Sequence, residues 1–184
     1  TIAGIESADA CLLIATNPRR EAVMVNARLR KRSRQRPFPV AAIGEPADLT
    51  YPVEQLGNDP RLLDDIAEGR HPFAQILREA ARPMLILGTA ALTRPDDAAA
   101  ILARVHQIAE AFGLIDTANG WNGFNVLHTA AARVGGLDLG FVPGEGGKTA
   151  RDMVQPGALD VLFLLGADEI DARGSDAFKV YLGT

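Results

Sequence analysis

The stretch ACLLIATNPRRE (Ala10–Glu21) carries the clearest architectural signal in this sequence. Its first part, Ala10 to Ala15, is an apolar run without polar alternation, which is typical of a strand covered on both faces of a parallel sheet. The run stops at Thr16-Asn17, and Pro18 stands where a helix would begin. The stretch therefore predicts a buried strand, a polar turn and a helix.

Further apolar runs occur along the chain. Three have the same unalternating character: Val40 to Ile43, Met84 to Leu87 and Val161 to Leu165. A fifth run, Phe178 to Leu182, contains Lys179 and alternates more, so we expect it nearer an edge of the sheet. These runs predict the strands of one mainly parallel sheet.

Helical patterns lie between these runs. The clearest follows Pro95, where apolar residues from Ala98 to Phe112 recur at three- and four-residue steps and Gly113 can end the helix in a left-handed cap. Further helices are predicted at Arg19 to Arg32, Pro60 to Glu68, Phe73 to Ala81 and Phe124 to Val134. Alternating strands and helices predict an α/β fold, a three-layer α/β/α domain with a doubly wound sheet, spanning residues 1–184 as a single domain.

Composition sets limits on function. The 184 residues are 47% apolar and 23% charged, as in a globular protein, and the net charge of -4 gives no general attraction to nucleic acid. The apolar runs are far shorter than the ~20 residues of a spanning helix, so we expect no direct membrane insertion. The single cysteine, Cys11, lies in an apolar run, and the three histidines lack zinc-ligand spacing. We therefore predict no metal site and no cysteine-held cluster in this chain.

A basic cluster follows the first strand. It consists of Arg28, Arg30, Lys31, Arg32, Arg34 and Arg36, with Arg19 and Arg20 shortly before it. We interpret these residues as cations at a helix C-terminus, on a surface that is solvated or faces an acidic partner. A nucleic-acid patch is the alternative, but no aromatic residues are interleaved for base stacking.

The stretch NGWNGFNVLH (Asn119–His128) is unusual. Its two Asn-Gly pairs predict two tight turns around the sole tryptophan, followed by the helix from Phe124. We interpret Trp121 as a packing anchor and His128 as a core or capping residue, because no nucleophile accompanies it.

Ligands of doubly wound sheets bind beyond the carboxyl ends of the strands. The candidate pocket residues are therefore Thr16, Asn17, Gly88, Gly166, Asp168 and Glu169. Thr16 and Asn17 could meet phosphate or ribose oxygens, but the interpretation we favour is that Asn17 caps the helix and Pro18 takes its first position, which needs no ligand. Asp168, Glu169 and Asp171 are either site carboxylates or members of a solvated loop. The GEGGKT stretch (Gly144–Thr149) lacks the first glycine of a phosphate loop, so we interpret it as an ordinary loop.

Four segments together resemble a known family: ADACLLIATNPRREAVMVNARLRKR, LTYPVEQLG, NGWNGFNVLHTAAARVGGLDLGFVP and ALDVLFLLGADEID. The resemblance is to the large iron-sulfur subunit of respiratory complex I, the 75 kDa type, and it covers the whole chain. This subunit is related to the molybdopterin oxidoreductases, whose formate dehydrogenase and DMSO reductase members share the predicted fold. We expect a fragment of a longer chain, because the sequence lacks an initiator methionine and stops directly after its last predicted strand.

In the active relatives, a Ser/Thr-Asn turn and a later Gly-x-Asn-Pro turn help to hold the guanine dinucleotide end of a molybdenum cofactor. Thr16 and Asn17 match the first turn, whereas Gly166 is followed by Asp168 and Glu169 where Asn-Pro is expected. A carboxylate pair would repel a pyrophosphate. The resemblance therefore implies a vestigial pocket with no bound cofactor and no catalytic residue.

The preferred hypothesis is a structural, inactive fragment of a parent oxidoreductase that is proton-translocating and passes electrons from NADH to quinone. The iron-sulfur clusters are expected in the missing N-terminal part. The expected partners are other subunits of the peripheral arm and the rest of its own subunit, on the cytoplasmic side of a bacterial inner membrane, without nucleic acid. The alternative is an intact guanine-dinucleotide cofactor domain of an active molybdopterin oxidoreductase.

Overall fold

A computed structural model describes residues 2–35, 37–128, 130 and 132–183. The chain divides into two compact units, a first unit of residues 1–129 and a second unit of residues 130–184.

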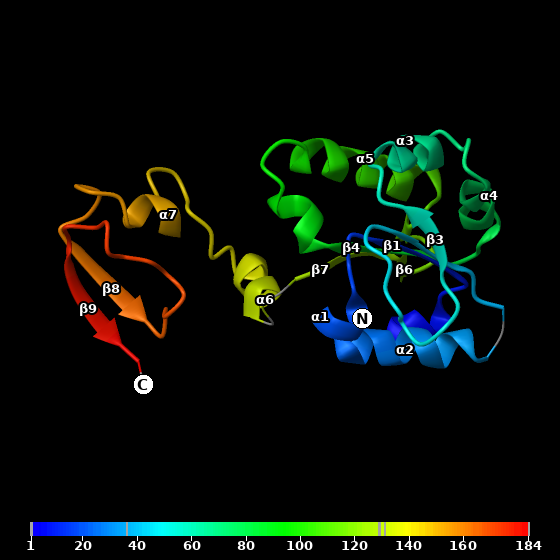
Figure 1. Cartoon of the computed structure of the whole chain (residues 1–184), viewed down its shortest axis with the longest axis horizontal. Coiled ribbons are helices and arrows are strands. Elements are labelled where there is room, and N and C mark those ends of the chain that lie inside the picture. The colour runs from blue at the N-terminus through cyan, green and yellow to red at the C-terminus, as the bar shows by residue number, and fades with distance from the viewer. Residues whose placement is uncertain (1, 36, 129, 131, 184) are drawn as a thin grey trace. The chain divides into compact units, whose positions relative to one another are not determined.

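The first unit is built on a five-stranded parallel sheet (Figure 1). Its strands, in the spatial order β3-β2-β1-β4-β7, are β1 (Ala10–Ile14), β2 (Val40–Ile43), β3 (Glu54–Gly57), β4 (Pro83–Gly88) and β7 (Phe124–Leu127). The register pairs Cys11 with Val40 on one side of β1 and with Met84 on the other. The order reverses between β1 and β4, which confirms the predicted α/β fold and its doubly wound sheet.

Each face of this sheet is covered by helices, as Figure 1 shows. Leu12 and Ile14 of β1 pack into a core on the side of the sheet that carries α3, α4 and α5, whereas Cys11 and Leu13 pack into a second core with Leu29 of α2. All five side chains of β1 are buried. The helices are η1 (Ile2–Ser7), α2 (Val23–Ser33), α3 (Arg61–Ala67), α4 (Pro72–Glu79), η2 (Thr89–Thr93) and α5 (Ala98–Ala111). Gly113 follows α5 with a φ of +60°, which confirms its predicted left-handed cap.

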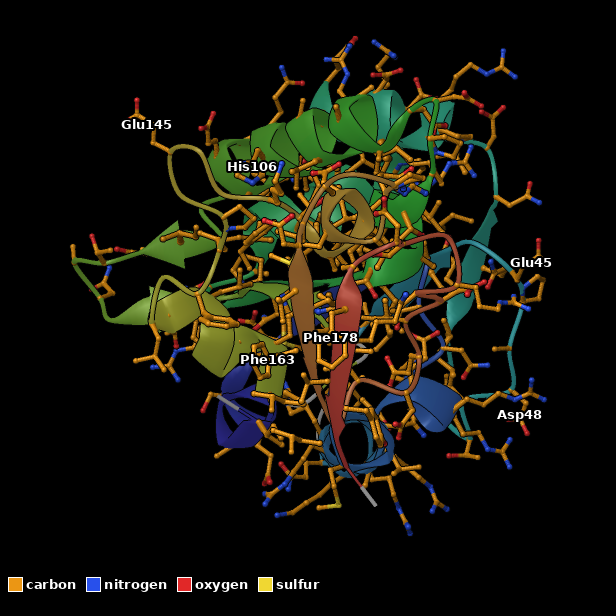
Figure 2. All side chains as sticks on the ribbon, turned by 90° about the vertical axis from the view of Figure 1, so that its left-hand side faces the viewer. Glu45, Asp48, His106, Glu145, Phe163 and Phe178 are labelled. Atoms are coloured by element: carbon orange, nitrogen blue, oxygen red, sulfur yellow. The ribbon has the colours of Figure 1, made fainter. Side chains whose placement is uncertain are left out.

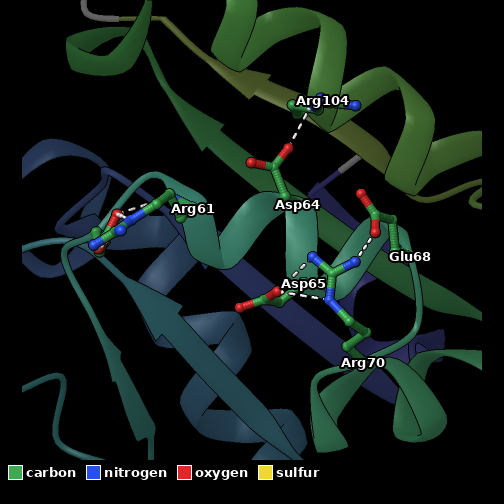
Figure 3. A network of polar contacts seen from close by, with 7 residues as sticks. Arg61, Asp64, Asp65, Glu68, Arg70 and Arg104 are labelled. Carbon is green, nitrogen blue, oxygen red and sulfur yellow. Dashed lines mark hydrogen bonds and ion pairs between the residues drawn. The ribbon is translucent and has the colours of Figure 1, made fainter.

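Polar contacts fix the helices of one face (Figure 3). Arg104 of α5 forms an ion pair of 2.6 Å with Asp64 of α3, so the two helices are joined by charge as well as by apolar packing. Arg70 reaches back to Asp65 at 2.6 Å and also pairs with Glu68. Exposed pairs of this kind contribute little each, about 0–1 kcal/mol, so the network orients the helices more than it stabilises them.

The predicted single helix from Arg19 to Arg32 is wrong in one respect. The chain forms a short helix α1 (Pro18–Glu21) and then α2, and the two are separated by Ala22 with φ -152° and ψ 74°. The N–H of Ala22 donates to the carbonyl of Pro18, which closes α1 after one turn. Asn26 then anchors α2, because its side-chain amide donates to the carbonyl of Leu49 at 3.2 Å.

Much of the basic cluster has structural contacts. Arg28 and Lys31 both pair with Glu6, and the buried Arg32 donates to the carbonyl of Ala8 at 2.6 Å. Arg30, Lys31 and Arg32 occupy the last turn of α2, as predicted, where the helix dipole favours cations. Arg36 lies outside the described residues.

The predicted helix from Phe124 to Val134 is also wrong. A hairpin of β5 (Ile115–Asp116) and β6 (Trp121–Asn122) leads instead into the strand β7, which pairs with β4. Asn119-Gly120 forms the predicted turn, but Asn122-Gly123 does not turn: a Cβ on Gly123 would lie 2.0 Å from the carbonyl oxygen of Pro83. The Trp121 indole N–H donates to that same carbonyl at 2.9 Å, which confirms the anchor. These contacts seat the segment beside β4, where Phe124 packs against the core.

The second unit contains α6 (Ala132–Asp138), α7 (Ala150–Met153), β8 (Val161–Leu165) and β9 (Phe178–Leu182). Thr149 caps α7 and exchanges hydrogen bonds with Asp152, so the GEGGKT loop ends in a helix cap. The strands β8 and β9 form a separate two-stranded parallel sheet. The prediction that Val161 to Leu165 is covered on both faces is therefore wrong, since Leu162 is its one buried residue. The buried core of the described part of this unit is small: Leu162, Ala172 and Ala177.

Candidate functional site: a cleft at the carboxyl ends of the strands

The first unit has a cleft of about 1010 Å³ beyond the carboxyl ends of its strands. It lies at the point where the strand order reverses between β1 and β4, the position at which doubly wound sheets bind ligands. The wall includes Thr16, Asn17, Arg19, Arg20, Glu21, Gly44, Glu45, Asp48, Asn58, Ala90 and Arg94. Thr16 and Asn17, two of the predicted pocket residues, line this cleft.

A carboxylate of the chain itself occupies the polar turn after β1. The hydroxyl of Thr16 donates to Oε2 of Glu21 at 2.7 Å, and the backbone N–H of Asn17 donates to Oε1 at 2.9 Å. These two donors are the groups that an anionic ligand of this turn would need. Sequence reasoning missed Glu21. The available signal was its position one helical turn after the cap residue, from which an acidic side chain can reach back to the helix start.

Gly88, another predicted pocket residue, is not among the residues that line the cleft, and backbone crowding accounts for a glycine at this position. A Cβ on Gly88 would lie 2.1 Å from the carbonyl oxygen of Ala15, so the ends of β1 and β4 can approach this closely only with glycine there. Ala15 itself has a φ of +47°, a conformation that L residues with side chains rarely adopt. The strained turn directs Thr16 and Asn17 into the cleft wall.

Ion pairs neutralise much of the rest of the wall. Arg19 pairs with Asp48 at 2.6 Å, and the backbone N–H of Thr50 also donates to Asp48. This N–H, followed by the Arg19 guanidinium, lowers the pKa of the Asp48 carboxyl below its ordinary value. Arg94 pairs with Asp97 and likewise lowers the pKa of that carboxyl. These arginines are therefore already paired with carboxylates of the chain.

Three buried polar side-chain atoms of the first unit have no hydrogen-bond partner among the described residues. The first is Oδ1 of Asp64, which lies 2.6 Å from Arg104 in an ion pair. The other two, which have no ion pair with a described residue either, are Oδ1 of Asn17 in the cleft wall and Nδ1 of His128, which follows β7. No hydrogen bond of His128 Nδ1 to a described residue supports the predicted core or capping role of this side chain. Asn17 occupies the N-cap position of α1 with Pro18 at its start, as the helix-cap interpretation predicts, but its side chain makes no capping hydrogen bond.

The remaining predicted pocket residues, Gly166, Asp168 and Glu169, belong to the second unit. They follow β8, as predicted, and all three residues are exposed. Asp168 accepts a hydrogen bond from the Tyr181 hydroxyl. Asp171 pairs with Arg173 at 2.6 Å, and this contact lowers the pKa of Asp171 to about 2. These carboxylates therefore form a charged loop beside β9.

The described residues contain neither a metal-binding group of side chains nor a membrane-spanning helix. Within residues 2–35, 37–128, 130 and 132–183, no group of three or more His, Cys, Asp or Glu side chains is arranged to hold a metal ion. No helix in this part of the chain is long and apolar enough to cross a membrane. Cys11 is fully buried, and burial raises the pKa of its thiol.

A parallel sheet covered by helices, with a polar cleft where its strand order reverses, defines a doubly wound α/β domain. The chain belongs to the molybdopterin oxidoreductase family, whose model matches residues 1–184.

The relatives confirm the resemblance to the large subunit of complex I. The chain is 43% identical to the mitochondrial NADH dehydrogenase [ubiquinone] iron-sulfur protein 1 of Solanum tuberosum, across 100% of this chain and 24% of that protein. It is 43% identical to the NADH-ubiquinone oxidoreductase 75 kDa subunit of Reclinomonas americana, across 99% of this chain and 26% of that protein. It is 39% identical to an NADH-quinone oxidoreductase subunit of Rickettsia bellii, across 100% of this chain and 25% of that protein. The chain thus spans about a quarter of the length of these relatives.

The cleft fits the guanine dinucleotide of a molybdenum cofactor poorly. The Thr16 hydroxyl and the Asn17 N–H, which match the first turn of the active relatives, donate to Glu21 instead of being free. A further carboxylate, Glu45, stands in the same wall. An added pyrophosphate would therefore have to displace one negative charge and approach another.

Proposed function

We propose that this chain is a structural, non-catalytic part of the large iron-sulfur subunit of a complex I type NADH:quinone oxidoreductase. The observation that carries the proposal is the 39–43% identity to such subunits across the whole chain. The parent subunit would take part in electron transfer from NADH to quinone. Its iron-sulfur clusters would be held by other parts of the longer polypeptide, because the sole cysteine here is buried.

In this proposal, the partners are the rest of the same subunit and other subunits of the peripheral arm, on the cytoplasmic side of a bacterial inner membrane. The names of the relatives support association with complex I. The basic cluster gives little support to nucleic-acid binding, because Arg28, Lys31 and Arg32 are engaged within the first unit.

Activity measurements on the assembled complex test the structural role. We expect Thr16→Ala and Asn17→Ala, introduced into the full-length subunit, to leave NADH:quinone activity within about twofold of the parent, because neither residue would touch a reacting group. Deletion of residues 1–184 should prevent the subunit from assembling. A loss of more than about tenfold in kcat for either cleft variant, with the complex intact, would contradict a non-catalytic role.

The second candidate is a guanine-dinucleotide cofactor domain. It is favoured by the size of the cleft and by the unpartnered Oδ1 of Asn17 in its wall. Calorimetry with GDP separates the two proposals: the structural role predicts no binding at millimolar GDP, whereas measurable heat would support the cofactor domain.

Two variants refine this experiment. Glu21→Ala frees the Thr16 and Asn17 donors, whereas Glu45→Ala removes the same charge from the same wall without affecting them. If Glu21 is what blocks the turn, GDP binding should appear in the first variant and be absent from the second.

A further inference from the structure

The sheet of the second unit has one face made entirely of apolar side chains. The register pairs Val161 with Phe178, Phe163 with Val180, and Leu165 with Leu182, and paired residues of adjacent strands lie on the same face. We call these six residues the apolar strand face. Phe163, Leu165 and Phe178 are 62%, 71% and 71% exposed. Figure 2 labels Phe163 and Phe178, one on each strand.

The opposite face of the same sheet is covered along β8, whereas Lys179 and Tyr181 of β9 are exposed there. Leu162 is buried and Leu164 half-buried, and they pack with Met153, Val154 and Leu159 from the segment around α7. The two faces of β8 thus differ sharply. Soluble proteins rarely expose contiguous apolar patches of this kind unless the patch binds something.

The strand direction indicates what covers the apolar strand face. Strands β8 and β9 are parallel, and parallel sheets in proteins have helices packed on both faces. Each strand has five residues, which span about 16 Å. A helix of about eleven residues has the same length. An amphipathic helix of three turns therefore matches the face in length as well as in polarity.

The charges beside the strands indicate the polar flanks of this helix. Residues 155–183 contain five Asp or Glu and two Lys or Arg. Asp160 directly precedes β8 and Glu169 follows it, and neither forms an ion pair among the described residues. A helix flanked by Lys or Arg would complement both ends of the strand.

We propose that the apolar strand face binds an amphipathic, basic-flanked helix supplied by a part of the same polypeptide outside residues 1–184. The source follows from the proposed function, on which this inference rests: the chain spans about a quarter of its relatives, so most of the parent polypeptide lies elsewhere. The helix binds by apolar burial on Phe163 and Phe178, and its basic flanks fix its position along β8.

A peptide experiment on the isolated chain tests the binding chemistry. The probe is a fluorescein-labelled, 14-residue Leu/Lys amphipathic peptide, and the control is a peptide of the same composition with a scrambled order. We expect fluorescence anisotropy to show binding of the amphipathic peptide, weakened by about tenfold or more in the double variant Phe163→Ser, Phe178→Ser. The matched variant Phe141→Ser, at a phenylalanine of the same unit that is 88% exposed, should bind within about twofold of the parent chain. Equal binding of the scrambled peptide, or no effect of the double variant, would overturn the proposal.

Cross-linking in the full-length subunit tests the source. Benzoylphenylalanine at position 163 should cross-link to one peptide of the same polypeptide outside residues 1–184, with apolar residues at three- and four-residue spacing. The same probe at position 141 should not give that product. A cross-link to residues 2–128, to a second copy or to another subunit would overturn the assignment of the source. The NADH:quinone assay above is independent of both results, so failure of the helix proposal and failure of the proposed function can be distinguished.

Discussion

Strands β1 and β8 have nearly the same composition but very different surroundings. Both are five-residue apolar strands, ACLLI and VLFLL. Every residue of β1 is buried between two helical layers and two neighbouring strands, whereas β8 has one neighbour, β9, among the described residues and one buried residue. An apolar run therefore specifies a strand, but not how many of its sides the available chain can cover.

The two units differ in how much of their sheets they bury. The first unit obtains its stability from cores on both faces of its sheet, and its cleft is built on this rigid frame. The second unit buries few residues, and a two-stranded sheet alone is at best marginally stable in water. Its exposed apolar face is consistent with a surface that is completed by another part of the polypeptide.

The largest expected effect comes from the core of the first unit. Leu85→Ala should lower the free energy of unfolding by about 2–5 kcal/mol, because Leu85 is fully buried on β4. The corresponding change on the second unit, Phe163→Ala, should cost about 0.5 kcal/mol or less, because the ring is mostly exposed. Urea unfolding followed by circular dichroism measures both. Equal losses would mean that the isolated chain buries Phe163, and the contrast between the units would fail.

Substituting glycine by alanine should change stability in opposite directions at one position of each unit. Gly88→Ala should destabilise the first unit by about 1–3 kcal/mol, since its Cβ would collide with the carbonyl of Ala15. Gly135→Ala lies in α6, where a Cβ meets nothing within 4 Å, so it should stabilise the helix by up to about 1 kcal/mol. Thermal unfolding of the two variants checks the signs, and a neutral Gly88→Ala would disprove the proposed close approach of β1 and β4.

Much of the first unit could be predicted from the sequence, because its signals are local. Unbroken apolar runs gave three of its buried strands, and the periodic spacing after Pro95 gave α5. Strand β3 was not predicted, because its sequence, EQLG, is neither apolar nor alternating. It forms through pairing with β2 at the edge of the sheet, which is a tertiary interaction.

The wrong helix from Phe124 also has a tertiary cause. FNVL was predicted as helix, but Gly123 and Trp121 seat it against Pro83, and this contact joins residues nearly forty positions apart. In the cleft, Thr16 and Asn17 could be placed because polar residues directly follow a strand. The role of Glu21 was missed although its signal is local, because an acidic residue one helical turn after Asn17 can reach back to the helix start.

Removing one hydrogen-bond donor from an aromatic side chain should lower the free energy of unfolding moderately in the first unit and only slightly in the second. Trp121→Phe removes the N–H that donates to Pro83, and we expect a loss of about 1–2 kcal/mol. Tyr181→Phe removes the exposed hydroxyl that donates to Asp168, and we expect a loss of about 0.5 kcal/mol or less. Urea unfolding again gives both values, and a larger loss for Tyr181→Phe would show that the loop after β8 is held more firmly than its exposure indicates.

The smallest expected effects are changes in the pKa values of two exposed carboxylates. One is stabilised mainly by an arginine side chain and the other mainly by a backbone N–H. In the second unit, Arg173 is the main cause that lowers the pKa of Asp171 from an ordinary 3.8 to about 2. In the first unit, the backbone N–H of Thr50 is the main cause for Asp48, ahead of Arg19. Both pKa values are depressed by folding, so the small stabilisation is present above the unfolded-state pKa near 4 and is lost as the pH falls through the folded-state pKa.

Removing the arginine side chains should therefore raise the pKa values of the two carboxylates by unequal amounts. Arg173→Gln should raise the pKa of Asp171 toward its ordinary value, because the largest favourable contact is gone and only the backbone N–H of residue 173 still donates to the carboxylate. Arg19→Gln should raise the pKa of Asp48 less, because the N–H of Thr50 still donates to the carboxylate. Carbon-13 NMR titration of the two carboxyl groups measures both shifts. A larger rise for Asp48 than for Asp171 would mean that the side chain of Arg19, and not the folded backbone at Thr50, holds the carboxylate of the first unit.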